Sequence, residues 1–163
     1  MTLTTHSIIA AAVTKPLAAM NPLIAFVVAI ASHYLSDAIP HWDYQLTSVE
    51  DKEDKEKRHF GNNRNAIIKD VSSMALDGLL GATIVLAVVQ PTTLHQWMWA
   101  LAAIIGGSLP DFLQGLYMLK LKFLRPHQRL HDIFHTNIRL GHYPLFGIPF
   151  QHVITAIALW VLF

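Results

Sequence analysis

The sequence predicts an all-α fold, a polytopic membrane bundle of about five helices, in a single domain over residues 1–163. Hydrophobic residues make up 53% of the chain and charged residues only 14%, whereas soluble proteins contain about 25% charged residues. All but one of the 12 lysines and arginines lie in two stretches, 52–69 and 120–139. The apolar runs outside these stretches are therefore expected to cross a bilayer.

The composition also excludes several classes of protein and site. The net charge is +1, and the basic residues near 50–58 are mixed with acidic ones, a pattern that argues against nucleic-acid binding. The chain has no cysteine, so disulfides and thiolate metal sites are excluded. Any metal must be held by histidine and carboxylate.

The first two helices are predicted near the N-terminus. This segment lacks the charged start and small-residue cleavage site of a signal peptide, so we take it as mature sequence. Thr5 is a candidate cap for a first helix of about 14 residues, ~21 Å long, which ends at Pro16 and is short enough to be re-entrant. Pro22 suits the first turn of a second helix, expected over about 23–39.

Two longer helices are predicted in the middle of the chain. The polar stretch 43–65 alternates in charge and is expected to be a solvated loop or a short surface helix. A third helix follows over about 66–89, with Asp77 inside it. A fourth, over about 93–119, contains Pro110, which should weaken or kink it just before Asp111.

The sequence ends with a second basic stretch, near 120–147, and a last helix predicted over about 148–163. Counting spans places both polar stretches on the same side of the membrane. Because both are rich in lysine and arginine, that side should be cytoplasmic in a multi-pass membrane protein. The buried ionisable residues are then expected near this side: His6, His33, Asp37, Asp77, Asp111 and His152. Only His95 falls on the far side.

The motif of His33 and Asp37 is the first candidate for chemistry. Each ionisable group in a hydrophobic span disfavours insertion by roughly 2.5–3.5 kcal/mol, so it needs a partner or an ion. Spacing of four places both residues on one helical face, and His41 continues the line. This geometry suits a two-ligand metal clamp, with a hydrogen-bonded structural pair as the alternative.

A second histidine motif lies in the basic stretch. His127, His131 and His135 are spaced by four residues and would form one stripe on a helix, either as metal ligands or as a solvated, pH-sensitive face. The segment HDIFH resembles the HExxH zinc motif with Asp132 in place of the glutamate base. The shorter carboxylate weakens the interpretation as a protease.

Three segments, SHYLSD at 32–37, LPD at 109–111 and HDIFHT at 131–136, resemble motifs of the YdjM-like, LexA-regulated inner-membrane metal-dependent hydrolases. Residues 5–7, Thr-His-Ser, are similar to the THS-like element of that family. The motif order here is rearranged, and the LPD lacks the Asp and His that follow it in the family. The resemblance implies a membrane-embedded hydrolase with these metal ligands: His33, Asp37, Asp111, His131 and His135. We add His6 to this set.

We therefore expect a metal-dependent hydrolase whose His/Asp site opens at the cytoplasmic interface. Zinc is the expected metal, with manganese and iron as alternatives, bound as one or two ions. The candidate proton carriers are Asp77, Asp132 and His41. A site at headgroup level favours a lipid ester or phosphoester as substrate. Four basic residues could steer a phosphate or act as positive-inside anchors: Lys120, Lys122, Arg125 and Arg129.

Other classes of function remain open at this point. A metal-ion or proton-coupled transporter would use Asp77, Asp111 and the interrupted fourth helix as its path. A membrane metalloprotease would use the HDxxH segment. A non-catalytic scaffold stabilised by metal would show the same ligands.

Overall fold

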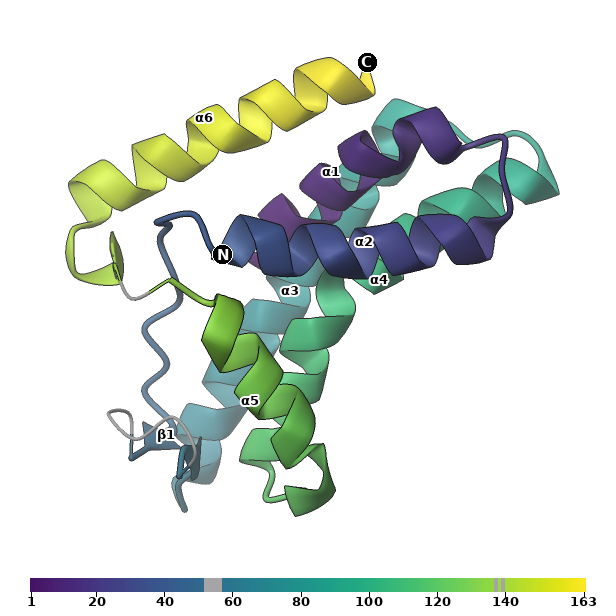
Figure 1. Ribbon diagram of the computed structural model, residues 1–163. Coiled ribbons are helices and arrows are strands. Elements are labelled where there is room, and N and C mark those ends of the chain that lie inside the picture. The colour runs from purple at the N-terminus through teal and green to yellow at the C-terminus, as the bar shows by residue number, and fades with distance from the viewer. Residues whose placement is uncertain (52–56, 137, 139) are drawn as a thin grey trace.

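A computed structural model of the chain describes residues 1–51, 57–136, 138 and 140–163. Its described part is built from α-helices, with one short hairpin (Figure 1), which confirms the all-α prediction. The α-helices are α1 (Leu3–Thr14), α2 (Pro22–Asp37), α3 (Arg64–Val89), α4 (Leu94–Met118), α5 (Arg125–Phe134) and α6 (Pro144–Leu162). Strand β1 (Val49–Glu50) pairs antiparallel with β2 (His59–Phe60), and 3-10 turns cover Lys15–Leu17, Lys122–Leu124 and Leu140–His142.

Local sequence signals explain where the helices begin. The Asn21 side chain accepts a hydrogen bond from the Leu23 backbone N–H, and Pro22 occupies the first turn of α2. Thr93 caps α4 in a capping box with Gln96. The expected cap Thr5 is wrong, because α1 begins earlier and Thr2 is its cap.

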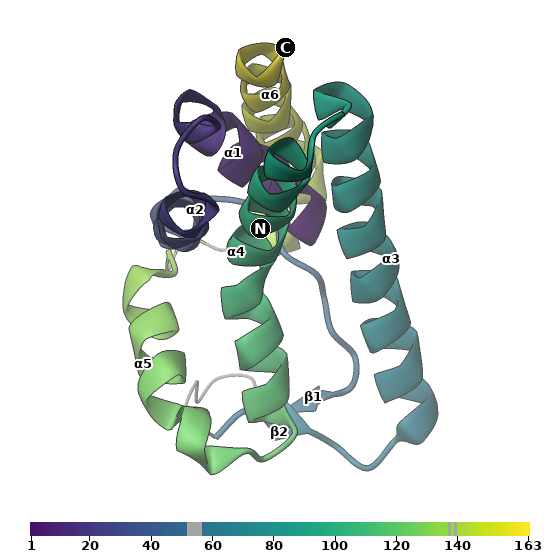
Figure 2. The ribbon, with the colours of Figure 1, turned by 90° about the vertical axis from the view of Figure 1, so that its right-hand side faces the viewer.

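Helix α1 is the centre of the molecule. It packs against α2, α3, α4 and α6, and Figures 1 and 2 show it enclosed by them. Small and branched apolar side chains fill this core, including the fully buried Ile8, Ala25, Val85 and Ala103. The α1–α2 and α3–α4 turns lie at one end of the molecule, and the hairpin and α5 lie at the other (Figures 1 and 2).

Two glycines of α4 allow close approach of its neighbours. A Cβ at Gly107 would lie 2.7 Å from the Cβ of Ala10, and one at Gly106 would lie 2.8 Å from the Cβ of Ala29. No side chain fits at such distances without a shift of the backbone. The contact brings the polar ends of α1 and α2 against the turn of α4 that carries Asp111.

Helix α4 continues through Pro110 rather than breaking there. Pro110 has no N–H to donate to the carbonyl of Gly106, so the helix loses one hydrogen bond at this point. Figure 1 shows α4 bent about its middle, with its first half beside α2 and its second half beside α5. The bend lets one helix contribute to both the bundle and the polar end.

The polar stretches contain more structure than expected. In the first, near 43–65, the described residues form the β1–β2 hairpin, where a loop or surface helix was expected; residues 52–56 lie outside the described part. The second, near 120–147, contains α5. The four-residue histidine spacing is compatible with α5, whereas the alternating charges gave no sign of the hairpin, and both elements pack against α4.

Two helices in the described part, α3 and α6, are long and apolar enough to cross a membrane. Helix α2 is apolar but has only 16 residues, fewer than the ~20 that a straight span needs. The finer prediction of five crossing helices is therefore not confirmed. Much of the apolar surface of α3 faces outward: Leu76, Leu79 and Leu80 are 67, 64 and 54% exposed.

Candidate metal centre

Imidazoles and carboxylates from separate parts of the chain converge at the polar end of the bundle. Helix α2 ends there, α5 packs against its end and against α4, and α1 begins beside them. The converging residues are His6 of α1, His33 and Asp37 of α2, His41 and Asp43 after it, Asp111 of α4, His131 of α5, and His135 at the end of α5.

Four of these residues form what we call the first group: His33, Asp37, Asp111 and His131. Each offers one ligand atom within 4.8 Å of the others. His131 Nε2 lies 3.3 Å from both Asp37 Oδ2 and Asp111 Oδ1, and His33 Nε2 lies 3.2 Å from Asp37 Oδ2. One cation could contact all four side chains after small movements.

Asp37, His41 and His135 form the second group, by the same distance criterion. Asp43 lies between its two histidines, with Oδ1 2.9 Å from His41 Nε2 and Oδ2 3.3 Å from His135 Nε2. Asp37 therefore belongs to both groups.

His6 lies beside both groups. Its Nε2 is 3.1 Å from Asp37 Oδ1 and 3.9 Å from Asp111 Oδ2. Its ring stacks on that of His33, with centroids 3.9 Å apart. Helix α1 thus adds a fifth imidazole to the centre.

In three of these histidines, the ring nitrogen that faces away from the centre, Nδ1, forms a hydrogen bond with a backbone carbonyl. Nδ1 of His33 donates to the Gly107 carbonyl at 2.8 Å, and Nδ1 of His41 donates to the Ile39 carbonyl at 2.6 Å. Nδ1 of His135 donates to the Thr136 carbonyl at 3.2 Å. Since a carbonyl can only accept, a neutral ring in each place presents a lone pair on Nε2 to the centre.

Ser36 orients His6 in the same way. The Ser36 hydroxyl donates its one hydrogen to the His33 carbonyl at 2.8 Å. Its oxygen must then accept from His6 Nδ1, 3.1 Å away. A neutral His6 therefore also directs an Nε2 lone pair toward Asp37, and metal-ligating histidines are held by such outer contacts.

Several of the inward atoms have no hydrogen-bond partner among the described residues: His6 Nε2, His41 Nε2 and Asp37 Oδ2. Their side chains are each about 1% exposed. Lone pairs of imidazole and carboxylate that face one another repel, and burial without compensation is costly. A cation between them removes both penalties, and this donor set suits Zn²⁺, Mn²⁺ or Fe²⁺.

One positive group already contacts the centre. The amino group of Met1 lies 3.1 Å from Asp37 Oδ1 and 2.9 Å from Asp43 Oδ1. Burial raises the pKa of the Asp43 carboxyl, but the positive charge of the Met1 amino group outweighs it and holds that pKa well below its usual range. Asp43 is thus a permanent anion beside the second group.

Two of the residues predicted to carry protons lie outside both groups. The Asp77 carboxylate accepts from the Thr4 backbone N–H at 3.0 Å and from the Thr4 and Tyr44 hydroxyls. It joins α3 to α1 instead of reaching either group. Asp132 accepts from Gln128 Nε2 at 3.0 Å on α5. His41, the third, belongs to the second group.

Other histidines are distributed away from the centre. His95 lies at the far end of the bundle, where its Nε2 is 3.0 Å from the Ala18 carbonyl. His152 is exposed on α6 and bonds the Ile148 carbonyl. His127 lies one turn before His131, with its ring nitrogens buried and without a hydrogen-bond partner among the described residues.

The sequence interpretation did not include Gln114, Ser36 or Asp43 in the site. The Gln114 amide lies 3.1 Å from His131 Nδ1. Its position three residues after Asp111 on one helical face was a usable signal. Ser36 precedes Asp37 directly, but its link to His6 depends on how α1 packs, which local sequence does not reveal.

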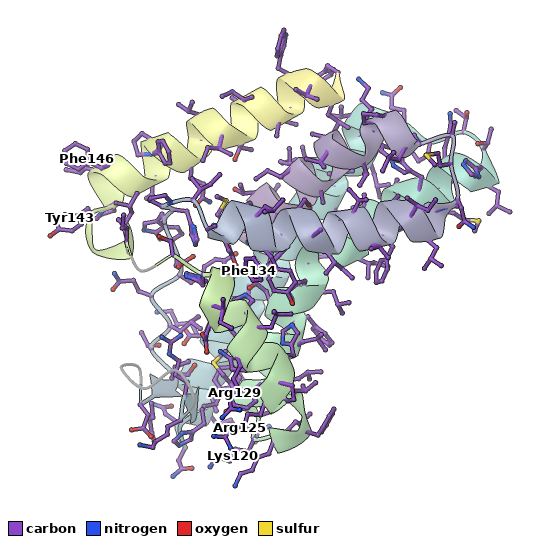
Figure 3. The ribbon with its side chains drawn as sticks, in the orientation of Figure 1. Lys120, Arg125, Arg129, Phe134, Tyr143 and Phe146 are labelled. Atoms are coloured by element: carbon purple, nitrogen blue, oxygen red, sulfur yellow. The ribbon has the colours of Figure 1, made fainter. Side chains whose placement is uncertain are left out.

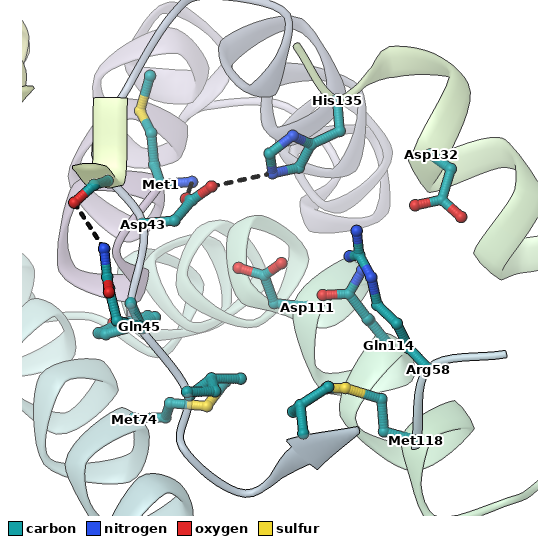
Figure 4. A pocket seen from close by; sticks show the side chains of 14 residues that line it. Met1, Asp43, Gln45, Arg58, Met74, Asp111, Gln114, Met118, Asp132 and His135 are labelled. Carbon is teal, nitrogen blue, oxygen red and sulfur yellow. Dashed lines mark hydrogen bonds and ion pairs between the residues drawn. The ribbon is translucent and has the colours of Figure 1, made fainter. Parts of the chain in front are cut away.

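A cavity of about 270 Å³ adjoins the centre. Figure 4 shows Asp43 and His135 above the cavity, Asp111 near its middle, and Asp132 and Arg58 both on the right. Met74 and Met118 lie below, and Leu46 and Val49 also line the cavity. The cavity therefore joins a charged wall to an apolar one.

Comparison with protein-family models, with curated proteins and with solved structures gives no match to this chain in any of the three.

Proposed function

We propose that this protein is a membrane-embedded hydrolase that depends on a divalent cation held by the first group. The observation that carries the proposal is the convergence of four inward ligand atoms, two imidazole and two carboxylate, in a buried place. The outer nitrogen of His33 is fixed by the Gly107 carbonyl. Fixed outer contacts of this kind are typical of metal sites.

The exposed faces of α3 and α6 support the membrane location. A core helix of a soluble protein is mostly buried, whereas only 11% of the apolar window of α3 and 22% of that of α6 are buried. Tyr143 and Phe146, at the start of α6, are 63 and 74% exposed (Figure 3), as suits aromatic residues at a lipid–water interface. We propose a multi-pass protein of the inner membrane.

The sidedness of the proposal follows from charge. Lys120, Arg125 and Arg129 lie near the start of α5, at the same end of the molecule as the hairpin (Figure 3). The turns at the opposite end carry almost no basic residues. The positive-inside rule then orients the centre toward the cytoplasm.

A bound cation would supply Lewis acidity toward the scissile group and toward a water molecule. The residues of the chain do the rest. His33, Asp37, Asp111 and His131 would hold the ion, and Asp111 also lines the cavity. Asp132, on the cavity wall, is positioned to accept a proton at its carboxylate, while Gln128 holds that carboxylate in place.

The cavity favours an amphiphilic ester or phosphoester as substrate. Its volume of about 270 Å³ suits a head group and not a complete lipid. Arg58 contributes positive charge to the wall, and Met74 and Met118 accept the first carbons of an apolar chain. The remaining chain would stay in the bilayer beside the exposed helices.

Membership of the YdjM-like hydrolases is part of this proposal. The residues that the resemblance implies as ligands come from three separated segments: His33 and Asp37, Asp111, and His131 with His135. Their convergence in the two groups supports the kinship.

Elemental analysis and hydrolysis assays on the purified full chain test the proposal. We expect bound Zn, Mn or Fe and turnover of a lipid phosphoester in mixed micelles. His33→Ala and Asp111→Ala should lose metal and turnover together, whereas His95→Ala, at the far end, should keep both. Metal without turnover would identify a scaffold, and metal uptake into vesicles without turnover would identify a transporter. Protein without metal would refute the proposal.

A further inference from the structure

We infer that a second divalent cation binds the second group, bridged to the first cation through the two oxygens of Asp37, and that the substrate class is a phosphoester. This inference rests on the proposed function for the first cation. It assigns His41, Asp43 and His135 as metal ligands.

The two oxygens of Asp37 face different partners. Oδ2 lies 3.2 Å from His33 Nε2 and 3.3 Å from His131 Nε2, within the first group. Oδ1 lies 3.7 Å from His41 Nε2 and 3.1 Å from His6 Nε2. A carboxylate with separate ligands at each oxygen has the arrangement of a bridge between two ions.

His41 gives an independent indication of a ligand. Its side chain is 1% exposed, its Nδ1 donates to the Ile39 carbonyl, and its Nε2 has no hydrogen-bond partner among the described residues. The lone pair on Nε2 faces Asp43 Oδ1 at 2.9 Å. Two acceptors at this distance need a proton or a metal cation between them, and a divalent cation would also contact Asp37 and His135.

Charge also favours a second ion. Three carboxylates surround the centre, those of Asp37, Asp43 and Asp111. One divalent cation neutralises two of them, and the third is left beside neutral imidazoles at the second group. The competing occupant is the amino group of Met1, which contacts Asp37 and Asp43.

A pair of divalent cations limits the class of substrate that the site can act on. Such pairs are common in phosphatases and nucleases, where they stabilise charge on both the attacking and the leaving oxygen of a phosphoryl group. His135 and Asp43 line the same cavity as Asp111, so both groups face one substrate space. Arg58, on the same wall, suits an anionic head group.

Metal stoichiometry of the full chain in detergent tests the inference. Protein stripped with a chelator is titrated with Mn²⁺, and bound metal is measured by elemental analysis and by electron paramagnetic resonance. The wild type should bind two equivalents and give the spectrum of two coupled Mn²⁺ ions. His135→Ala and Asp43→Asn should each bind one equivalent and give an uncoupled spectrum, and the exposed-site control His152→Ala should behave as wild type.

The outcomes separate the two proposals. One equivalent in the wild type, with turnover intact, overturns the second ion and leaves the Met1 amino group in its place, without affecting the proposed function. No bound metal overturns both. Two equivalents in both His135→Ala and Asp43→Asn overturn the ligand assignment. Asp43→Asn has the same shape as the wild-type side chain, so it answers the question even if His135→Ala does not fold.

Discussion

The apolar core and the candidate metal centre are buried by the same helices, yet they differ in whether their buried groups have partners. Helix α2 supplies Ala25 to the core and His33 to the centre, and α4 supplies Ala103 and Asp111, in each case about two turns further along. The core is complete as it stands. In the centre, buried lone pairs face one another without partners, which costs stability. A cation bound among them would remove this cost.

This difference between core and centre predicts that metal binding and turnover depend most on Asp37, the residue shared by both groups. Asp37→Asn keeps the side chain's shape but removes the charge and one ligand oxygen. We expect it to lose bound metal and phosphoester turnover entirely. Metal should stabilise the wild type, by about 4 kcal/mol at a free concentration 1,000-fold above its dissociation constant, and should not stabilise the variant. Thermal unfolding with and without chelator measures this difference, and a metal-dependent shift in Asp37→Asn would contradict it.

A substitution in the core should lower the stability of the protein and leave its metal binding unchanged. Ile8→Ala, two residues from His6, removes a fully buried side chain and should cost about 2–5 kcal/mol of stability through the cavity that it leaves. The metal stoichiometry should not change, because Ile8 belongs to the apolar core cluster and to neither ligand group. Unfolding in denaturant and elemental analysis on the same sample give both values. Loss of metal at full stability would show that the two regions are not separable.

Ser36→Ala tests the outer contacts of the centre. The hydroxyl accepts from His6 Nδ1 and donates to the His33 carbonyl, so its removal frees the His6 ring to change tautomer. Metal affinity should fall by about 10–100-fold, as measured by competition with a chromogenic chelator. Ser32→Ala is the matched control: Ser32 lies one turn earlier on α2 and donates only to the Ala29 carbonyl. An equal loss in both variants would point to a general effect on α2.

The sequence predicted most of the helices and most of the centre, for different reasons. Long apolar runs define α3 and α4 nearly to the residue, because a membrane or a core demands them. His33 and Asp37 were recognisable because charge in an apolar helix is costly. Asp77 was chosen by the same rule, yet it binds Thr4 and Tyr44. Whether such a carboxylate meets an ion or a hydroxyl depends on how helices rotate against one another, and cost alone does not reveal it.

The hairpin, α5 and Asp43 lay beyond sequence reasoning for a related reason. The strands have only two residues each, too few for a periodic signal. Histidine spacing allowed α5 as a stripe, but its packing against the ends of α2 and α4 decides that His131 and His135 face different groups. Tertiary packing, not local pattern, divides these side chains between the two groups.

The smallest predicted effect concerns the glycines that hold the core and the centre together. A Cβ at Gly107 would lie 2.7 Å from Ala10 and 2.9 Å from the His6 carbonyl, whereas one at Gly115, on the same helix, would meet nothing within 4 Å. Gly107→Ala should therefore cost about 1–3 kcal/mol and weaken metal binding, since α1 must move away with His6. Gly115→Ala should gain up to about 1 kcal/mol from helix propensity and leave metal binding unchanged. If the two variants behave alike in unfolding and metal titration, the close contact of α1 with α4 does not position the centre.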